Sequence, residues 1–407
     1  MTRSFVAVWL GQTISILGSG MTWFALTIWA WQKTGQPTTL STIVFFAFLP
    51  TVLFTPLAGV FVDRWSRKQV MLLSDAATAL GTLLILTLYT TDALQIWHIY
   101  IISALAGFFT AFQYPAYLAA VTTLLPKEQY GRAQGMLGLS PALSGILAPI
   151  FAAGLLNKIG MQGIMLIDLA TFGVALATLI WVRIPSPAES EVGRASRSSV
   201  WGEIVFGFNY IRQRSGLRSL TFLFMLTNFF LAIGATLVAP LILSQTGNDE
   251  AILASVQSFG AVGGVLGGII LSVWGGPKRR THGIFLGGAG ACLLGITWLG
   301  LGTTFLLWAV GSFFFAFFEP IVEGGNLAIW QTKVEADIQG RVFSARQLLV
   351  QIPYLLGILV SGPLAEYRMG ISPLLVLAGI AGGLVFLSGY LFRSVRNVED
   401  LVPDQGA

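Results

Sequence analysis

Long apolar segments separated by very short polar loops constrain this chain more than any other feature of its sequence. Two such segments, residues 40–62 and 69–88, each reach the ~20 residues that a helix needs to cross a bilayer. The loop between them, Asp63-Arg64-Trp65-Ser66-Arg67-Lys68, carries three cations and one acid. Soluble proteins rarely place a cationic turn between two such segments. The pattern therefore predicts two membrane-spanning helices joined by a short basic loop.

The composition agrees with a chain built almost entirely of membrane spans. Of the 407 residues, 55% are hydrophobic and 10% are charged, and the mean hydropathy is +0.77. Ordinary soluble domains have about 25% charged residues, so this chain cannot present a normal hydrated surface. Twelve spans of about 20 residues use about 240 residues. The remainder suffices for short loops and one linker, so we expect neither a soluble catalytic domain nor enzyme activity.

Hydropathy divides the chain into twelve predicted spans with one polar interruption. We place the spans at residues 5–31, 40–62, 69–90, 95–119, 133–156, 162–182, 217–243, 251–274, 282–302, 305–329, 342–366 and 372–392. The sequence thus predicts an all-α membrane protein with two six-helix bundles. We assign residues 1–182 to the N-terminal bundle, 183–216 to a cytoplasmic linker, 217–392 to the C-terminal bundle and 393–407 to a cytoplasmic tail.

The predicted linker has two parts of different character. Residues 185–199 are polar and rich in Pro and Ser, which is typical of a flexible connection. In the following segment, apolar residues recur at helical spacing, namely Trp201, Ile204, Val205, Phe208 and Ile211. This pattern predicts an amphipathic helix at the cytoplasmic membrane surface.

The basic residues define the predicted orientation in the membrane. Of the 23 Lys and Arg residues, all except Lys33, Lys158 and Arg368 fall on the same side of the predicted spans. By the positive-inside rule that side is cytoplasmic, so we expect both termini there. The net charge of +5 follows from this topology, and we expect no nucleic-acid partner.

The two predicted bundles resemble each other in sequence. A Gly-Arg pair at 131–132 precedes span five, and a second pair at 340–341 precedes span eleven. Parallel repeats of this kind are related by a pseudo-symmetry axis along the membrane normal in one large class of transporters. The second copy differs at one informative position, because Ser272 stands where the first half has Asp63.

The end of the second span and the loop after it contain the pattern G-x-x-x-D-R-x-x-R-K, formed by Gly59, Asp63, Arg64, Arg67 and Lys68. This pattern resembles the signature between the second and third helices of the major facilitator superfamily. The resemblance implies two bundles that expose a substrate site between them to each side of the membrane in turn. It also implies a cytoplasmic gate in which Asp63 lies against the start of span eleven, with Arg132 and Arg341 in the gating motif.

A second segment indicates a subgroup of that superfamily. Residues 328–344 read AIWQTKVEADIQGRVFS, and Gly362-Pro-Leu-Ala365 follows. Both resemble the twelve-span drug:proton antiporters of the macrolide-efflux and enterobactin-exporter type. The resemblance implies a monomer in the inner membrane of a bacterium, with no cofactor and with the proton gradient as its energy source.

Acidic residues inside predicted spans are candidates for proton coupling, because a charge at mid-bilayer costs about 2.5–3.5 kcal/mol on insertion scales. Glu319 and Glu323 lie on one face of span ten together with Asn326. Two carboxylates close together in a low dielectric do not both ionise easily, which suits proton exchange. The alternative is that each acid is satisfied by a Tyr, an Arg or a helix end. We predict that Glu319 and Glu323 carry the coupling.

Two further acids lie in predicted spans of the first half. Asp75 is in span three, and we expect it either to pair with Arg67 or Lys68 or to bind a proton. Asp168 is near the start of span six, where we expect a capping or interfacial role.

Polar residues on apolar helices outline a predicted substrate cavity. They are Gln12, Ser15, Ser19, Trp23, Gln113, Tyr117, Asn228, Asn326, Gln347, Gln351 and Tyr354. Each one alone is more often a helix–helix hydrogen bond than a ligand contact. We find no Lys or Arg deep inside the predicted spans. A mostly apolar, weakly acidic cavity suits amphiphilic or cationic organic compounds better than sugar phosphates.

The glycine-rich segment 263–268 lacks the Lys-Ser/Thr that would hold a nucleotide phosphate, so no nucleotide site is predicted. These features together predict a proton-coupled exporter of amphiphilic compounds, with its substrate, protons and the lipid bilayer as partners. The alternatives left open are a dedicated siderophore exporter, a lysophospholipid flippase and a non-transporting membrane receptor. Buried titratable acids favour coupled transport over a receptor.

Overall fold

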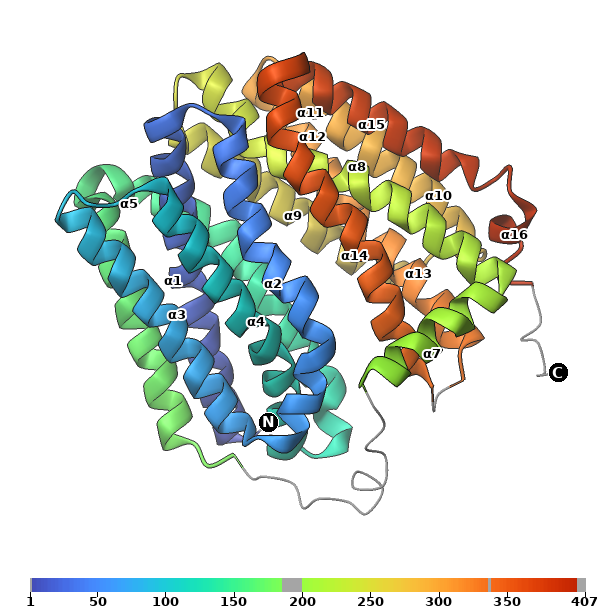
Figure 1. Cartoon of the computed structure of the whole chain (residues 1–407), viewed down its shortest axis with the longest axis horizontal. Coiled ribbons are helices and arrows are strands. Elements are labelled where there is room, and N and C mark those ends of the chain that lie inside the picture. The colour runs from blue at the N-terminus through green and yellow to red at the C-terminus, as the bar shows by residue number, and fades with distance from the viewer. Residues whose placement is uncertain (1, 185–199, 336–337, 401–407) are drawn as a thin grey trace. The chain divides into compact units, whose positions relative to one another are not determined.

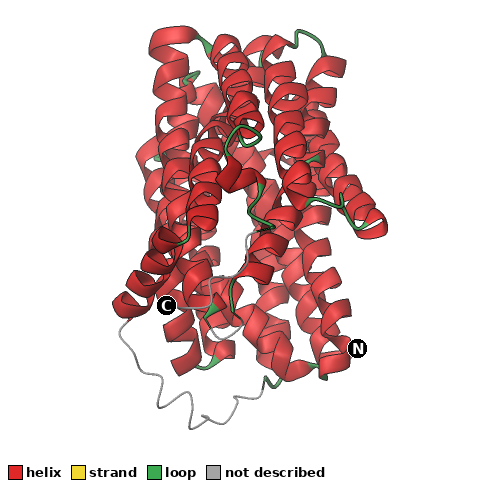
Figure 2. Cartoon of the chain, turned by 90° about the vertical axis from the view of Figure 1, so that its right-hand side faces the viewer, coloured by secondary structure: helices red, strands yellow, loops and turns green. Residues whose placement is uncertain are grey.

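The computed structural model describes residues 2–184, 200–335 and 338–400, without the side chains of residues 59–64, 127, 200, 201, 203 and 204. Within these ranges every regular element is helical, and no strand occurs (Figure 1, Figure 2). The protein is therefore all-α, as the sequence predicts. The proline- and serine-rich part of the predicted linker, 185–199, lies outside the described residues.

The chain divides into two compact units. The N-terminal unit comprises Met1–Gly35 and Thr42–Ser198, and the C-terminal unit comprises Gln36–Ser41 and Ser199–Ala407. The helices of the N-terminal half are α1 Arg3–Thr34, α2 Pro37–Arg64, α3 Arg67–Thr90, α4 Ile96–Leu124, the short turn η1 Lys127–Gln129 and α5 Tyr130–Trp181. Those of the C-terminal half are α7 Val200–Gln213, α8 Ser215–Thr246, α9 Glu250–Trp274, α10 Arg280–Gly290, η2 Ala291–Ile296, α11 Thr297–Leu301, α12 Phe305–Phe317, α13 Glu319–Lys333, α14 Gln339–Leu364, η3 Ala365–Met369, α15 Ile371–Ser388 and α16 Arg393–Arg396.

Eleven helical stretches of the described residues are long and apolar enough to cross a bilayer. One of them, α5, has 52 residues. A straight helix of that size is about 78 Å long, far more than the ~30 Å of hydrocarbon it would cross. Gly160 interrupts α5 with φ 66° and ψ 179°, so that α5 consists of two spans joined at a kink. Counting both halves gives the twelve spans that hydropathy predicts.

Span nine contains a change of helix type in its middle. It is made of α10, the π-helix η2 and α11. The carbonyl of Cys292 accepts the backbone N–H of Thr297, five residues later, and the Thr297 hydroxyl also donates to it at 3.1 Å. The hydroxyl thus supports the wider π turn from the side. Cys292 itself is fully buried, which fits the interpretation of a small apolar residue rather than a reactive thiol.

Close packing of α1 against α5 dominates the N-terminal unit. Gly11 and Gly18 of α1 lie directly against Thr178 and Thr171 of α5, where a Cβ atom would collide with the threonine side chains. Small residues at such positions let helix backbones approach each other, which is how helices associate without a hydrophobic driving force in lipid.

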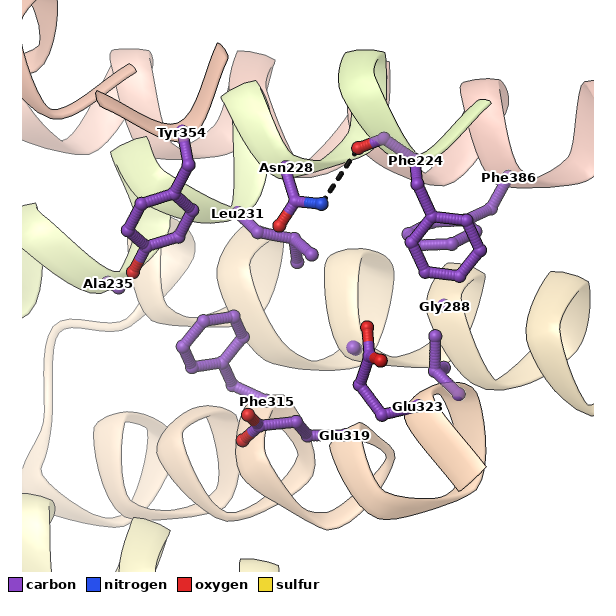
Figure 3. Close-up of a pocket in the computed structure, with 12 residues that line it drawn as sticks. Phe224, Asn228, Leu231, Ala235, Gly288, Phe315, Glu319, Glu323, Tyr354 and Phe386 are labelled. Carbon is purple, nitrogen blue, oxygen red and sulfur yellow. Dashed lines mark hydrogen bonds between the residues drawn. The ribbon is translucent and has the colours of Figure 1, made fainter. Parts of the chain in front are cut away.

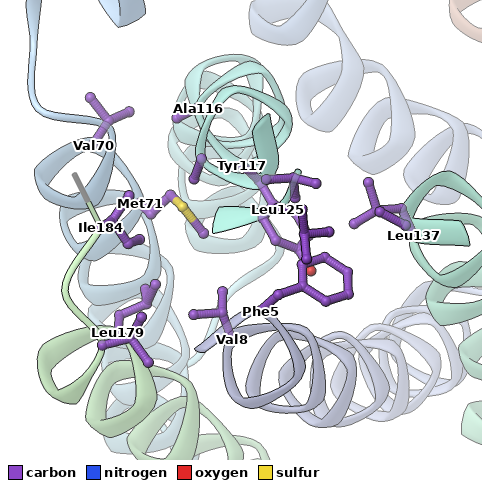
Figure 4. Packing of buried hydrophobic residues seen from close by; sticks show 14 residues of the cluster. Phe5, Val8, Val70, Met71, Ala116, Tyr117, Leu125, Leu137, Leu179 and Ile184 are labelled. Carbon is purple, nitrogen blue, oxygen red and sulfur yellow. The ribbon is translucent and has the colours of Figure 1, made fainter. Parts of the chain in front are cut away.

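An apolar cluster joins α1, α3, α4 and α5 in the same unit (Figure 4). Phe5 and Val8 of α1 meet Met71 of α3 and Leu179 of α5, and all four are at most 1% exposed. Tyr117 of α4 packs into this cluster as well. The cluster holds the ends of four helices in a fixed register beside the polar residues described below.

Glycines also set the contact between α9 and α12 in the C-terminal unit. Gly263 and Gly267 lie against the backbone carbonyls of Phe313 and Phe317, closer than any side chain would permit. Gly268, on another face of α9, has open space beside it. The sequence leaves open whether these glycines serve close packing or bending, and in this structure α9 is an unbroken helix that uses them for packing.

The residues after α16 pack back onto the C-terminal unit. The Glu399 carboxylate accepts the backbone N–H groups of Arg280 at 3.2 Å and of Thr281 at 2.8 Å. These N–H groups belong to the first turn of α10, where no intrahelical acceptor exists. Lys333 donates to the Glu399 carbonyl at 2.6 Å. The predicted tail is therefore, up to residue 400, a cap for span nine.

Candidate functional site

The C-terminal unit encloses a cavity of about 240 Å³ (Figure 3). Its walls come from α8, α10, η2, α12, α13, α14 and α15, and are lined by Phe224, Asn228, Leu231, Ala235, Gly288, Ala291, Phe315, Glu319, Val322, Glu323, Tyr354 and Phe386. Most of these side chains are apolar. The polar exceptions, Asn228, Glu319, Glu323 and Tyr354, are all residues that the sequence predicts for proton coupling or for the substrate cavity.

A break in span ten places Glu319 at this cavity. The helix α12 ends at Phe317, and α13 begins at Glu319, with Pro320 in its first turn. Proline is harmless there because the first N–H groups of a helix have no intrahelical acceptor. The same free N–H groups and the helix dipole favour a negative charge in the first turn. The local sequence therefore explains how a carboxylate is accommodated at this depth of an apolar span.

Glu323, one turn further along α13, is not isolated. Its Oε2 lies 3.7 Å from the Arg346 Nη2, and Asn326 Nδ2 donates to the same oxygen at 3.4 Å. The Glu323 side chain is 54% exposed, whereas that of Arg346 is only 10% exposed. The Arg346 guanidinium also lies 5.4 Å from the centre of the Trp330 ring and 6.0 Å from that of Phe224. An acid and two aromatic rings thus hold this arginine in place.

The expectation that no cation lies deep in the spans is wrong. Arg346 is about two turns into α14, buried, and in contact with two residues that line or adjoin the cavity. The sequence counts Arg346 with the basic residues of the cytoplasmic side, because it lies only about one turn into the predicted span 342–366. The signal that would have located it is its acidic partner on the preceding span.

Not all of the remaining predicted cavity residues of this unit line the cavity. Asn228 lines the cavity but donates to the Phe224 carbonyl of its own helix at 2.8 Å. Asn326 is fully buried beside Glu323. Gln347 is exposed and Gln351 is half-buried, and neither lines the cavity.

In the N-terminal unit, Asp75 lies at the centre of a polar cluster from three helices. Gln12 Nε2 of α1 donates to its Oδ2 at 2.8 Å, and Gln113 Nε2 of α4 donates to its Oδ1. The two glutamines are joined as well, at 3.3 Å. Asp75 is 1% exposed. Its carboxylate is therefore held by amide N–H donors.

The pairing of Asp75 with Arg67 or Lys68, one of the two expected outcomes, does not form. Arg67 instead donates to the Ala119 carbonyl of α4 at 2.7 Å. Lys68 donates to the carbonyls of Ile180 and Val182, at 2.8 and 2.9 Å. Those carbonyls end the second half of α5, where the helix dipole favours a cation. Both basic residues therefore tie together helices within the N-terminal unit.

The other predicted cavity residues of this unit have varied surroundings. Ser15 is buried, Trp23 is 40% exposed, and Ser19 donates to Asp168. Tyr117 belongs to the apolar cluster of Figure 4, and its hydroxyl has no partner among the described residues.

Asp168 does not have the capping or interfacial role expected of it. Because the two halves of α5 meet at Gly160, this residue lies about two turns inside span six and is 1% exposed. It accepts hydrogen bonds from Ser19 of α1 and Thr82 of α3. The first half thus contains two buried carboxylates.

The predicted gate is only partly described. Gly59 lies on α2, and the side chains of Asp63 and Arg64 are outside the part of the chain that the structure describes. Arg132 is exposed, and the exposed Arg341 places its guanidinium 5.7 Å from the centre of the Phe206 ring of α7. The gating role of these residues stays a prediction. The described part of the chain contains no group of three or more His, Cys, Asp or Glu side chains placed to hold a metal.

Comparison with known proteins places this architecture in a family. The model of the Major Facilitator Superfamily matches residues 8–358. Macrolide efflux protein A of Streptococcus pyogenes is 28% identical over 382 residues, covering 92% of each chain. Multidrug efflux pump Tap of Mycolicibacterium fortuitum is 24% identical over 369 residues, covering 86% of each chain.

A solved structure supports the fold. The crystal structure of nucleoside transporter NupG matches with a TM-score of 0.71 at 12% identity, covering 96% of this chain and 100% of that chain. The family model covers most of the chain, and its apolar helices make it a multi-pass membrane protein. The protein therefore belongs to the major facilitator superfamily of transporters.

Proposed function

We propose that this protein is a proton-coupled exporter of amphiphilic organic compounds, working by alternating access in the plasma membrane of a bacterium with both termini in the cytoplasm. Relatives named for macrolide and multidrug efflux match over most of its length. The observation that carries the proposal is Glu319, an acid without an ion-pair partner among the described residues, in the wall of a mostly apolar cavity. An apolar wall holds a hydrophobic solute, and one acid provides a place for either a proton or a cationic group.

The charges around the cavity support this substrate class. Arg346 forms an ion pair with Glu323, and the two charges offset each other. Glu319 has no ion-pair partner among the described residues, so one net negative charge remains. An anionic solute is repelled by that charge, whereas a cationic amphiphile is attracted to it. The buried arginine therefore leaves the predicted preference for cationic and neutral compounds unchanged.

The size of the cavity defines what it holds. Pockets for drug-sized ligands usually measure about 300–1,000 Å³, and this one measures about 240 Å³. It therefore accommodates one substituent of a macrolide-sized molecule. In the proposed cycle the ionised Glu319 binds the cationic substituent, and a proton arriving at the same carboxylate releases it. Exchange at a single acid couples proton entry to substrate exit.

Transport by the purified protein in liposomes tests this proposal. The substrate is a fluorescent cationic dye or an erythromycin-type macrolide, and a pH difference is imposed across the membrane. Glu319→Gln is expected to reduce pH-driven accumulation at least about ten-fold, whereas equilibrium binding of a neutral macrolide survives. Glu323→Gln is the matched control, with a smaller effect on coupling. Undiminished pH-driven accumulation by Glu319→Gln contradicts the assignment, and transport confined to ferric-chelating compounds indicates the siderophore alternative.

A further inference from the structure

The surroundings of Asp168 in the N-terminal unit form a second polar site, separate from the cavity of the C-terminal unit. The Ser19 Oγ of α1 lies 3.2 Å from Asp168 Oδ1, and the Thr82 Oγ1 of α3 lies 3.2 Å from Oδ2. Gly18 adds to this arrangement, because a Cβ atom there would lie 3.1 Å from the same carboxylate. The glycine lets the acid reach the α1 backbone.

A third hydroxyl completes the site. Thr22 follows Ser19 by about one turn of α1, is 5% exposed and interacts with the Asp168 carboxyl. Its Oγ1 nevertheless forms no hydrogen bond of normal geometry with that carboxyl or with any other described residue. A buried hydroxyl without a partner is uncommon, and each such group calls for an explanation. Here it belongs to the same ring of oxygens as Ser19 and Thr82.

The charge of Asp168 is incompletely compensated by these contacts. No Lys, Arg or His in the described part of the chain forms an ion pair with it. The oxygen of a hydroxyl that donates to an ionised carboxylate usually lies about 2.5–2.7 Å from the carboxylate oxygen. The Ser19 and Thr82 hydroxyl oxygens lie farther away, each at 3.2 Å. A lone ionised carboxylate inside a span is costly. The site as built therefore calls for a positively charged ligand.

The geometry points to a metal cation rather than to a proton. Hard cations of the size of Ca²⁺, which Na⁺ resembles, take oxygen ligands at about 2.3–2.6 Å. Neighbouring oxygens around such an ion are about 3.4 Å apart in octahedral geometry, close to the spacing of 3.2 Å found here. A proton needs one carboxylate oxygen and one acceptor, which leaves the clustering of three hydroxyls from two other helices unexplained.

We propose that Asp168, Ser19, Thr22 and Thr82 bind Na⁺. A single carboxylate matches a single positive charge, and an all-oxygen ligand set excludes the softer transition metals. The ion joins α1, α3 and the second half of α5. Asp75 does not offer a comparable site, because Gln12 and Gln113 direct N–H donors at its carboxylate and these would repel a cation.

Binding to the purified full-length protein in nanodiscs tests the proposal without any transport measurement, so it is independent of proton coupling at Glu319. The melting temperature is followed as NaCl replaces choline chloride at constant ionic strength and pH. We expect a Na⁺-specific rise that increases with the logarithm of the concentration, as a ligand of the folded state produces. KCl should give a much smaller rise, because the oxygen spacing of 3.2 Å suits ion–oxygen distances of about 2.3–2.6 Å and K⁺ takes longer ones.

Variants locate the ion. Asp168→Asn is expected to abolish the Na⁺ effect, and Thr22→Val, which preserves shape and removes an unpartnered hydroxyl, should weaken Na⁺ at least about ten-fold. Asp75→Asn, a buried carboxylate of the same unit, should retain it. If Asp168→Asn does not fold, Thr22→Val alone decides. Equal stabilisation by choline and Na⁺, an unchanged response in Thr22→Val, or stabilisation by low pH in the absence of Na⁺ with no Na⁺ effect would each overturn the proposal.

Discussion

Replacing Glu323 by Gln should destabilise the C-terminal unit by about 1–2 kcal/mol. Coulomb's law for the Nη2–Oε2 distance of 3.7 Å gives about 1 kcal/mol in bulk water and about 4.5 kcal/mol at an effective dielectric of 20. Because the Glu323 side chain is 54% exposed, solvent screens the pair and the lower part of that range applies. The variant leaves Arg346 buried without its anion, and the Trp330 and Phe224 rings compensate only in part.

The partner variant should behave differently. Arg346→Leu removes the buried charge itself, and replacing a buried ion by a well-packed apolar side chain is often nearly neutral. Adding Glu323→Gln to Arg346→Leu should then cost less than about 0.5 kcal/mol, since the acid is half in solvent. The difference between the two backgrounds is the coupling energy of the pair.

The single cysteine of the chain provides the assay. Cys292 is fully buried in span nine, so a thiol-reactive fluorophore reports its exposure as the C-terminal unit unfolds. A loss of 1–2 kcal/mol corresponds to a fall of about 2–8 °C in melting temperature for a unit of about 200 residues. Added salt should narrow the gap between wild type and Glu323→Gln. An equal shift from Glu323→Gln in both backgrounds would show that the ion pair contributes nothing.

Three further predictions concern thermal stability, followed by Cys292 labelling for the two in the C-terminal unit and by the melting temperature of the whole protein for the one at Gly160. Glu399→Ala removes the acceptor of two N–H groups at the start of α10 and should cost about 0.5–2 kcal/mol, the usual range for a lost helix cap; no change would mean that the tail does not cap α10 in solution. Gly160→Ala should cost about 1–3 kcal/mol, because its φ of 66° and ψ of 179° lie in a region essentially restricted to glycine although space is free; Gly154→Ala, at a helical position with equal space, should be neutral. Gly267→Ala forces α9 away from a carbonyl of α12 and should cost more than about 2 kcal/mol, and Gly268→Ala on the open face less than about 0.5 kcal/mol; similar costs for the last two would contradict the packing of α9 on α12.

Hydropathy predicts the spans well because a lipid environment demands about 20 apolar residues per crossing, whatever their partners. The sequence predicts the junction of spans five and six less well. The segment around Gly160 predicts a loop between residues 156 and 162, and the chain instead turns within a continuous helical stretch at one glycine. Similarly, Pro320 does not predict that span ten is divided. A proline in the first turn of a helix and a proline inside a helix cannot be told apart from the sequence.

The sequence predicts a candidate site well when its residues lie on one helix, and poorly when they come from different helices. Glu319 and Glu323 stand out because they are acids one turn apart in an apolar segment. The surroundings of Asp168 come from two other helices, and its partners Ser19 and Thr82 are ordinary residues within their own segments. Periodicity along one helix carries no information on which helices meet. For the same reason the sequence counts Arg346 only as one of the basic residues on the cytoplasmic side, although its acid is on the preceding span.

The π-helix in span nine determines in which direction around the helix axis the residues beyond it point. Gly288, before it, lines the cavity; Gly295, inside it, lies against Phe315 of α12; and Gly300, after it, lies against Leu375 of α15. Each residue of an α-helix advances by about 100° around the axis, so one residue more or less in η2 would turn everything beyond it by that angle. Gly300 would then point away from Leu375, and a neighbouring leucine, Leu299 or Leu301, would take its place. The number of residues in this span is therefore as strictly specified as their identity, and a one-residue deletion in η2 is a more severe change than most substitutions there.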